Sequence, residues 1–428
     1  MNPAFWLLII MGICFLLNVP IAFSLGIAAL STVLITNIIP VARIPTLLVT
    51  SGDSFPLLAV PFFILAGEIM CTGGISKRLV SFSQSIFGGV TGSLGMITVF
   101  SCAIFASMCG SSPATVAAIG GIMVPSMVKQ NYEPEYASVL TAAGGTLGPV
   151  IPPSIVYIMY GVVTGTSVGD LFLAGVLPGI FICATLMVTT HLMSKKHGFG
   201  IKSDEKTSVK KILIATKEAF WALTMPVILL GGIYAGVFTP TEAAAVSCAY
   251  GLIIGLFVYK ELKFKDLWGL FSKTGLIMGS GVVVLGFAIG LGQVLTFLGV
   301  PFAFRDFMLR FTESKIVVLL MCNILLLIAG MFMETISIVL ILAPLLTPIV
   351  VAYGVNPVHF GIIMTFNLVI GQLTPPTAIN LFIASQLFNV QIVRMLKWLP
   401  WFLGVMIFDL IIITYIPTMS LALISLLR

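Results

Sequence analysis

The sequence GSSP at residues 110–113, followed by GPVIPPS at 148–154, decides the fold, because the same design occurs a second time in the chain. The second copy is MET at 333–335, followed by GQLTPPT at 371–377. In both windows Gly, Pro and hydroxyl residues interrupt long apolar stretches, and such interruptions break regular helices. The interruptions therefore predict two irregular regions of the same kind.

A fixed spacing relates the two windows. A shift of 223 positions aligns Ser111 with Glu334 and Ser112 with Thr335. It also aligns four proline pairs, where a random register would align about one. The chain is therefore predicted to consist of two internal repeats.

The composition places these repeats in a membrane. Hydrophobic residues make up 59% of the 428 positions and charged residues 8%, and apolar runs long enough to cross a bilayer recur throughout. Strand-like alternation is absent, so helices are the spanning structures that satisfy the backbone in hydrocarbon. We predict an all-α polytopic membrane protein with about ten to twelve spans. No Lys or Arg precedes Arg43, so the apolar start is expected to be a mature span and not a secretory signal.

The order of apolar and polar segments divides the chain into two similar halves. Each half is predicted to contain scaffold helices, a re-entrant helical hairpin and a broken helix. The predicted segments are a first repeat at 1–193, with scaffold helices at 1–88 and the hairpin and broken helix at 93–163; a cytoplasmic linker at 194–217; and a second repeat at 218–428, with a scaffold and arm region at 218–310, the hairpin and broken helix at 316–388 and a last span at 399–427.

Two connecting segments carry more detailed expectations. Residues 37–54 are predicted to be a polar connection. The stretch from Lys260 to Lys273 places apolar side chains opposite its lysines, which favours a helix lying on the inner membrane surface and bracing a moving part. A separate span is expected near Thr274 to Leu298.

The number of crossings predicts how the halves are oriented. Each half is expected to cross the membrane five times, because its hairpin does not cross. Since this number of crossings is odd, the second repeat starts on the opposite side of the membrane and must have inverted topology. With the N-terminus outside, sixteen Lys and Arg residues fall in inner loops and five outside. Both termini are therefore expected outside. This asymmetry accounts for the net charge of +6, so the charge indicates the lipid bilayer as a partner and no nucleic acid.

Inverted repeats with paired hairpins and broken helices are typical of secondary transporters, which hold substrate and coupling ions where helices break. A hard cation such as sodium prefers several oxygen ligands, and Ser, Thr and freed carbonyls supply them without net charge. Gly allows close backbone approach, and Pro leaves a carbonyl without its helical partner. Helix N-termini beside the tips would favour a carboxylate.

The full set of motifs resembles the large membrane subunit of a TRAP (tripartite ATP-independent periplasmic) transporter. The motifs are GSSPAT at 110–115, the breaks at 145–154 and 371–377, TPTEAAAV at 239–246 and the tip Glu334-Thr335. The resemblance covers essentially the whole chain.

The resemblance implies an elevator-type, sodium-coupled importer of organic acids, such as sialic acid or C4-dicarboxylates, with the general appearance of the sialic-acid branch. It implies a multi-pass protein of the bacterial inner membrane with periplasmic termini. The implied partners are a periplasmic substrate-binding protein and a small four-helix membrane subunit, expected as a separate chain because this sequence begins directly with the large subunit.

The resemblance also implies two sodium sites with the substrate between them, and neither a transition metal nor an organic cofactor. The sodium-binding residues implied are Ser111, Ser112, Thr115, Gly145 and Gly148 for the first site, and Glu334, Thr335, Gly371 and Thr374 for the second. The substrate-binding residues implied are Ser111, Ser112, Pro153, Ser154, Thr335, Pro376 and Thr377.

Several of these residues could also have purely structural roles. Ser and Thr in membrane helices often bond back to a carbonyl, and this alternative stays open for Thr115 and Thr377. Glu334 is an ionisable residue at an apolar tip, which suggests function, but it is equally suited to cap the following helix. Glu242, three residues after Thr239, is expected to form a capping box. Seven scattered cysteines without CxxC spacing are expected to be buried hydrophobic residues.

Two further classes of function compete with transport by a TRAP system. An enzyme is disfavoured, because none of the three histidines (191, 197 and 359) is placed to activate Ser111 or Ser112. A binding-protein-independent sodium/carboxylate symporter of similar architecture remains compatible with the residues. Only the family resemblance sets it aside.

Overall fold

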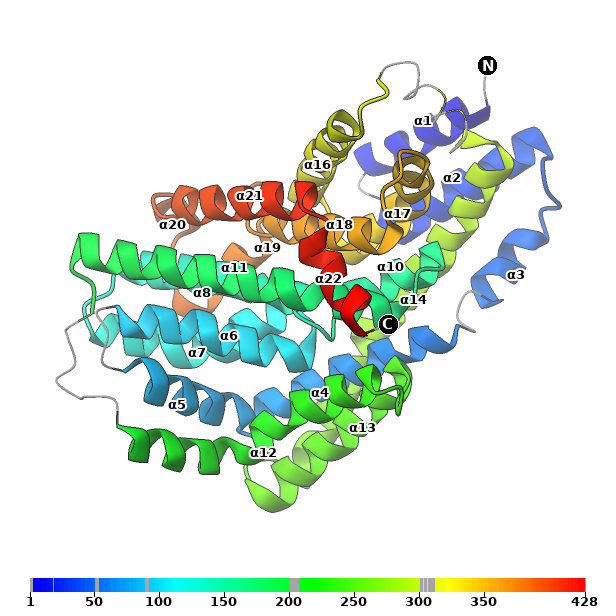
Figure 1. Ribbon diagram of the computed structural model, residues 1–428. Coiled ribbons are helices and arrows are strands. Elements are labelled where there is room, and N and C mark those ends of the chain that lie inside the picture. Colours follow the sequence, from blue (N-terminus) through cyan, green and yellow to red (C-terminus); the bar gives the residue numbers. More distant parts are fainter. Residues whose placement is uncertain are drawn as a thin grey trace.

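The computed structural model describes residues 3–17, 19–50, 54–88, 92–200, 208–300, 303, 306 and 312–427. Every regular element among these residues is helical (Figure 1). The first half contains α1 (Pro3–Leu16), α2 (Ile21–Thr36), α3 (Arg43–Thr50), η2 (Phe55–Leu58), α4 (Ala59–Thr72), α5 (Ile75–Phe87), α6 (Ser93–Cys109), α7 (Ser112–Lys129), α8 (Pro134–Gly145), α9 (Leu147–Val150), α10 (Ile155–Thr164) and α11 (Val168–His197).

The second half contains α12 (Val209–Tyr234), α13 (Pro240–Ile253), the π-helix η3 (Ile254–Val258), α14 (Phe264–Phe297), α16 (Lys315–Phe332), α17 (Thr335–Ala352), α18 (Pro357–Gly371), α19 (Ile379–Phe388), α20 (Ile392–Met395), α21 (Leu399–Tyr415) and α22 (Thr418–Leu427). Thus the predicted all-α class is confirmed.

Eight helices of the described segments are long and apolar enough to cross a membrane, or nine if the bent pair α21 and α22 forms one span. The shorter apolar helices α2, α6, α18 and α19 fall below that length. The five crossings expected in each half, and the inversion that follows from them, stay predictions.

Helix pairs and helix interruptions occur where the sequence places the two hairpins and the two broken helices, while the re-entry of the hairpins into the membrane stays a prediction. The first hairpin is α6 and α7, joined at Gly110, and the second is α16 and α17, joined at Met333 and Glu334. The first broken helix is α8, α9 and α10, interrupted around the Pro152–Pro153 pair. The second is α18 and α19, interrupted around the Pro375–Pro376 pair.

The broken helices pack across the two halves of the chain. The helix α10 of the first half packs on α17 of the second hairpin, and α19 of the second half packs on α7 and α8. The Tyr160 hydroxyl fixes the first of these contacts, because it donates to the Pro357 carbonyl at 2.8 Å and lies 3.1 Å from Thr347 Oγ1. The hairpins and broken helices therefore form one interlocked block.

A second group of helices, the scaffold, lies beside this block and contains α1 to α5 and α12 to α14, whereas α11, α21 and α22 pack on the block. The helix α4 packs on α13, α12 packs on α5 and α13, and α14 packs on α2, α3 and α4. The predicted capping box starts α13: the Glu242 N–H donates to Thr239 Oγ1, and the Thr239 N–H donates to Glu242 Oε2. The Thr241 hydroxyl on α13 donates to the Phe55 carbonyl of η2 and so fastens the start of α13 to the α4 segment.

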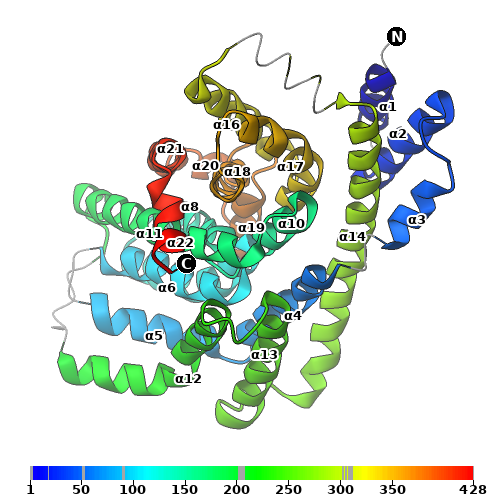
Figure 2. The ribbon, with the colours of Figure 1, turned by 45° about the vertical axis from the view of Figure 1, so that its right-hand side comes forward.

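The prediction of a surface helix followed by a separate span was wrong. Residues 264–297 form one helix, α14, of 34 residues. At a rise of 1.5 Å per residue such a helix is about 51 Å long. It contains no proline, and its glycines keep helical backbone angles, so nothing ends the helix between the basic and the apolar part. Figure 2 shows α14 running along one side of the molecule beside α1, α2 and α3.

Two shorter segments also differ from the expectation. The expected polar connection at 37–54 contains α3, whose Ile44 is buried and which packs on α14, while residues 51–53 lie outside the described residues. The amphipathic helix α5 follows Gly74 and was not predicted. In both segments, packing of a few apolar side chains stabilises a helix that the local sequence indicates only weakly.

The linker at 194–217 is shorter than expected. The helix α11 continues to His197, because Lys195 and Lys196 are favourable in a last turn, near the negative end of the helix dipole. The helix α12 already begins at Val209. Residues 201–207 of the predicted linker, with Lys202 and Lys206, lie outside the described residues.

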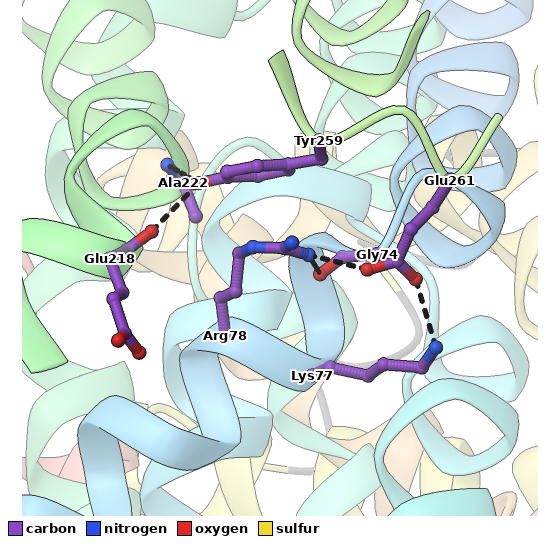
Figure 3. Close-up of polar contacts among 7 residues, drawn as sticks. All are labelled: Gly74, Lys77, Arg78, Glu218, Ala222, Tyr259 and Glu261. Carbon is purple, nitrogen blue, oxygen red and sulfur yellow. Dashed lines mark hydrogen bonds and ion pairs between the residues drawn. The ribbon is translucent and has the colours of Figure 1, made fainter.

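A cationic cluster joins α5, α12 and the segment before α14 (Figure 3). Lys77 Nζ and Arg78 Nη1 lie 2.8 and 2.7 Å from the two carboxylate oxygens of Glu261. The Arg78 guanidinium lies 3.7 Å from the centre of the Tyr259 ring, whose hydroxyl hydrogen-bonds to the backbone of α12. The hydrogen bonds from Lys77 and Arg78 hold the pKa of Glu261 below its usual range.

Candidate functional site

The first hairpin tip packs directly against the first broken helix. A Cβ atom added to Gly148 would lie 2.6 Å from the carbonyl carbon of Ser111 and 2.9 Å from the Ser112 nitrogen. A Cβ at Gly145 would lie 3.3 Å from the Ser112 carbonyl oxygen. Glycine is therefore required at Gly148 for this approach. The structure brings four residues of the predicted first sodium site together.

The tip itself is shaped by Gly110, which has a positive φ of 61°. A Cβ there would meet the Pro153 carbonyl oxygen at 2.6 Å and Ser154 Cα at 3.2 Å. The predicted substrate residues Pro153 and Ser154 thus lie beside the tip, and both are buried. The Ser154 hydroxyl accepts a hydrogen bond from the Tyr157 N–H and caps α10.

Thr115 forms the hydrogen bond to a backbone carbonyl that the sequence left open as its alternative, structural role. Its hydroxyl donates to the Ser111 carbonyl at 2.8 Å and lies 3.3 Å from Cys109 Sγ. The same Ser111 carbonyl accepts the Thr115 N–H at 3.1 Å. Thr115 therefore stabilises the first turn of α7.

The second hairpin meets the second broken helix in the same manner. A Cβ at Gly371 would lie 2.5 Å from Gly330 Cα and 2.6 Å from the Gly330 oxygen. Both the N–H and the hydroxyl of Thr377 donate to the Met331 carbonyl, at 3.1 and 2.8 Å. Gly371 and Thr377 are therefore fastened to the end of α16, one turn before the tip.

The other predicted residues of the second site differ in exposure. The buried Thr335 hydroxyl has no hydrogen-bond partner among the described residues, whereas the Thr374 hydroxyl donates to the Ile370 carbonyl at 2.8 Å. Pro376 is exposed. The Glu334 carboxylate accepts the Ser337 N–H at 3.2 Å and caps α17, while the residue is exposed to the central cavity. Glu334 therefore both caps α17 and lines the cavity.

Both tips open into one cavity of about 920 Å³ between the block and the scaffold. Ser111 and Pro113 of the first tip and Glu334 and Ser337 of the second line it, and Gln372 lies between them. The scaffold side of the cavity consists of α4, α14 and the start of α5. Of the predicted site residues, only Ser111 and Glu334 line this cavity.

The scaffold wall carries charged groups. Lys273 Nζ on α14 binds Glu68 Oε1 on α4 at 2.7 Å, and Lys77 lines the same end of the cavity. Glu68 thus joins two scaffold helices. Asp409 is buried on α21, and the Thr185 hydroxyl of α11 lies 2.6 Å from its Oδ2.

Two amide side chains near the second break were not predicted from the sequence. Gln372 and Asn380 are buried, and the side-chain carbonyl oxygen of each has no protein partner. Asn380 Nδ2 donates to Ser112 Oγ at 2.6 Å, so it contacts the opposite hairpin. The signal was present as polar amides within GQLTPPTAIN at 371–380, but spacing alone does not show which helix they face.

Among the described residues, no group of three His, Cys, Asp or Glu side chains is arranged to hold a metal ion. The unpartnered groups at the site are oxygens: Thr335 Oγ1, Gln372 Oε1 and Asn380 Oδ1. Neutral oxygens of this kind suit an alkali cation better than a transition metal.

The sequence and fold were compared with known proteins. A model of the family described as "Tripartite ATP-independent periplasmic transporter, DctM component" matches residues 8–419. An isethionate TRAP transporter permease protein DctMQ of Oleidesulfovibrio alaskensis is 42% identical over 94% of this chain, which spans 64% of that relative. The C4-dicarboxylate TRAP transporter large permease protein DctM of Rhodobacter capsulatus is 39% identical, with 98% of this chain and 99% of the relative covered.

Further relatives are named as large permease proteins for sialic acid and for 2,3-diketo-L-gulonate. Among solved structures, the Alcanivorax borkumensis YdaH transporter has a similar fold, with a TM-score of 0.61, 14% identity and 87% and 88% of the two chains covered. That likeness concerns the fold alone. On the family match and these relatives, the chain belongs to the DctM family, the large multi-pass permease subunits of TRAP transporters.

Proposed function

We propose that this chain is the translocating subunit of a sodium-coupled importer of an organic acid. An elevator movement of part of the chain would carry the acid across the inner membrane. The observation that carries the proposal is that both hairpin tips face one cavity, with buried unpartnered oxygens at the second break. Such oxygens are costly to bury unless a ligand completes them. Sodium is the cation that neutral hydroxyl and carbonyl oxygens suit.

We assign the two ion sites to the two contacts between tip and break. The first comprises Ser111, Ser112 and Thr115 with the backbone of Gly145 and Gly148. The second comprises Thr335 and Thr374 with the backbone of Gly371 and the tip at Glu334, and we add Gln372 because its free Oε1 belongs to the same break.

The substrate is proposed to lie between the tips, with its carboxylate near the starts of α7 and α17. Helix N-termini carry partial positive charge and unpaired N–H groups, which favour an anion. The implied contacts are Ser111, Ser112, Pro153, Ser154, Thr335, Pro376 and Thr377. The named substrates of the relatives are organic acids of different shapes, and the sialic-acid branch is one of several possibilities.

The elevator movement is proposed from the division into an interlocked block and a scaffold. The block contains both tips and both breaks, whereas α4 and α14 supply only the facing wall of the cavity. The cavity extends toward Lys77 and Lys273, which positive-inside counting places on the cytoplasmic side. This conformation is therefore assigned as inward-facing.

The partners proposed are the small membrane subunit and the periplasmic binding protein of a TRAP system. The test is uptake into proteoliposomes that contain this chain and a small subunit, with and without a sodium gradient and with and without liganded binding protein. We expect uptake only when both the gradient and the binding protein are present. Sodium-driven uptake without the binding protein would favour the symporter alternative, and uptake indifferent to sodium would refute the coupling.

A further inference from the structure

Asn380 is the residue at which the two halves of the site touch. It lies in the first turn of α19 and is fully buried. Its Nδ2 donates to Ser112 Oγ at 2.6 Å and to the Ala142 carbonyl at 3.3 Å. Because that carbonyl can only accept, the amide nitrogen must face the first hairpin and α8. Its own N–H donates to the Gln372 carbonyl at 3.1 Å, in the second break.

The equivalent position of the first half makes no such connection. A shift of 223 positions places Tyr157 of α10 at the position equivalent to Asn380. The Tyr157 hydroxyl donates to the Val150 carbonyl at 2.9 Å, within its own half. The symmetry of the repeat therefore does not explain Asn380, and the contact with Ser112 is particular to the second half.

The hydrogen bond leaves Ser112 able to bind a cation. A hydroxyl oxygen has two lone pairs, so Ser112 Oγ can accept the amide hydrogen with one and offer the other to sodium. The amide fixes the direction of that second lone pair. An ion is then held best when α19 is docked on α7 and α8, and by linkage the bound ion stabilises that docking.

We propose that Asn380 is a positioning residue of the first ion site, which couples the occupancy of that site to the second broken helix through α19. This inference rests on the sodium coupling proposed above. The hydrogen bond from this amide would link ion binding at the first site to the position of the second broken helix. The sodium dependence of uptake would then be cooperative.

The test is a double-mutant cycle with Asn380→Leu and Ser112→Ala in the reconstituted transporter with its small subunit and binding protein. We expect Asn380→Leu to raise the half-saturating sodium concentration about fivefold, the effect of one lost hydrogen bond. Ser112→Ala should raise it further, because it removes a proposed ion ligand as well as this hydrogen bond. The Hill coefficient for sodium should fall toward one in both single variants, while in Asn380→Leu the substrate KM at saturating sodium stays within about twofold. The double variant should have the same sodium dependence as Ser112→Ala alone, because the amide of Asn380 has no effect on the ion site once the Ser112 hydroxyl is absent.

Asn367→Leu is the matched control. Asn367 is a fully buried amide on α18 whose Nδ2 donates to Asn323 Oδ1 and the Ile363 carbonyl and whose Oδ1 is also unpartnered. Its loss should leave the sodium concentration dependence unchanged. A second variant, Asn380→Ser, removes the amide while keeping a small polar side chain, and it covers the case in which Asn380→Leu does not fold.

The outcomes separate this inference from the proposed function. Multiplicative effects in the double variant, or an unchanged sodium dependence in Asn380→Leu or Asn380→Ser, would overturn the role of Asn380 while sodium coupling stands. An equal shift in Asn367→Leu would show a general effect of losing a buried amide and would overturn it too. Sodium-independent uptake by the unmodified protein would overturn both proposals.

Discussion

Two glycines determine how closely the second hairpin approaches its broken helix. A Cβ at Gly371 would lie 2.5 Å from Gly330 Cα, which is backbone and cannot rotate away. We expect Gly371→Ala to destabilise the protein by about 1–3 kcal/mol, the usual cost of overpacking, and to abolish most uptake. Thermal unfolding in detergent and proteoliposome uptake measure the two effects.

Gly404→Ala is the control for this substitution. Gly404 lies on α21, and a Cβ there would have no heavy atom within 4 Å. Alanine is also the better helix former, so stability should stay equal or rise slightly. Equal uptake by Gly371→Ala and Gly404→Ala would contradict the tight contact between α16 and α18.

At the residue scale the sequence predicted contacts that depend on backbone shape. Gly148 and Gly110 were recognisable because glycine close to proline in an apolar run usually marks a turn or a close backbone approach, and the structure places both in close contacts. Asn380 and Gln372 were missed because their role depends on which helix they face. Their assignment to an ion site, like that of Ser112, stays a prediction until sodium binding is measured.

The cluster around Glu261 belongs to the scale of elements, because it joins α5 to the segment before α14. The hydrogen bonds from Lys77 and Arg78 lower the pKa of Glu261 from 4.5 in the folded protein. The stabilisation that Glu261 contributes is therefore full above pH 4.5 and is lost as the pH falls through the lower pKa of the folded state. Glu261→Gln should therefore lower the melting temperature at pH 7, with a loss of about 1 kcal/mol or less for so exposed a pair. The difference from the unmodified protein should shrink below pH 4.5.

Arg78→Lys gives a sharper comparison at the same place. It keeps the charge but loses the flat contact with Tyr259 and part of the hydrogen-bonding geometry. We expect a smaller loss than in Glu261→Gln, measured by thermal unfolding at pH 7. A Glu261→Gln penalty that stays constant between pH 7 and pH 4 would show that Glu261 acts through packing and not through its charge.

The elements themselves were predictable to different degrees. The interruptions of the hairpins and broken helices follow from Gly and Pro inside apolar sequence, which no continuous helix tolerates well, and the helix ends lie in the expected ranges. The helices α3 and α5 were missed because they are short and their stability comes from packing on α14, α6 and α12. The continuity of α14 was missed because an amphipathic start resembles a surface helix, although no residue breaks the backbone there.

At the scale of the whole molecule, the cavity is a tertiary feature that the sequence did not predict. It exists because α10 crosses to α17 and α19 crosses to α7, which brings both tips to the same side of one block. The repeat predicts the two units separately but not this exchange. The exchange explains why the two proposed ion sites and the substrate would move together as one body.

The inward-facing assignment predicts the side from which the cavity can be reached. Ala117 on α7 is exposed and lines the cavity. In a background with Cys71 and Cys109 replaced by alanine, since both also line it, Ala117→Cys should react with a membrane-impermeant maleimide from the cytoplasmic side of membrane vesicles. Ala143→Cys, at a fully buried position of α8, should react from neither side.

Sodium and substrate should slow this reaction if they pull the tips together and shift the block. If sodium and substrate lower the fraction of inward-open molecules tenfold, labelling of Ala117→Cys should become about tenfold slower. Labelling from the periplasmic side alone would reverse the assigned orientation of the cavity. Labelling that is equal from both sides and indifferent to sodium would contradict a moving block altogether, because a fixed cavity has no second state for the ion to stabilise.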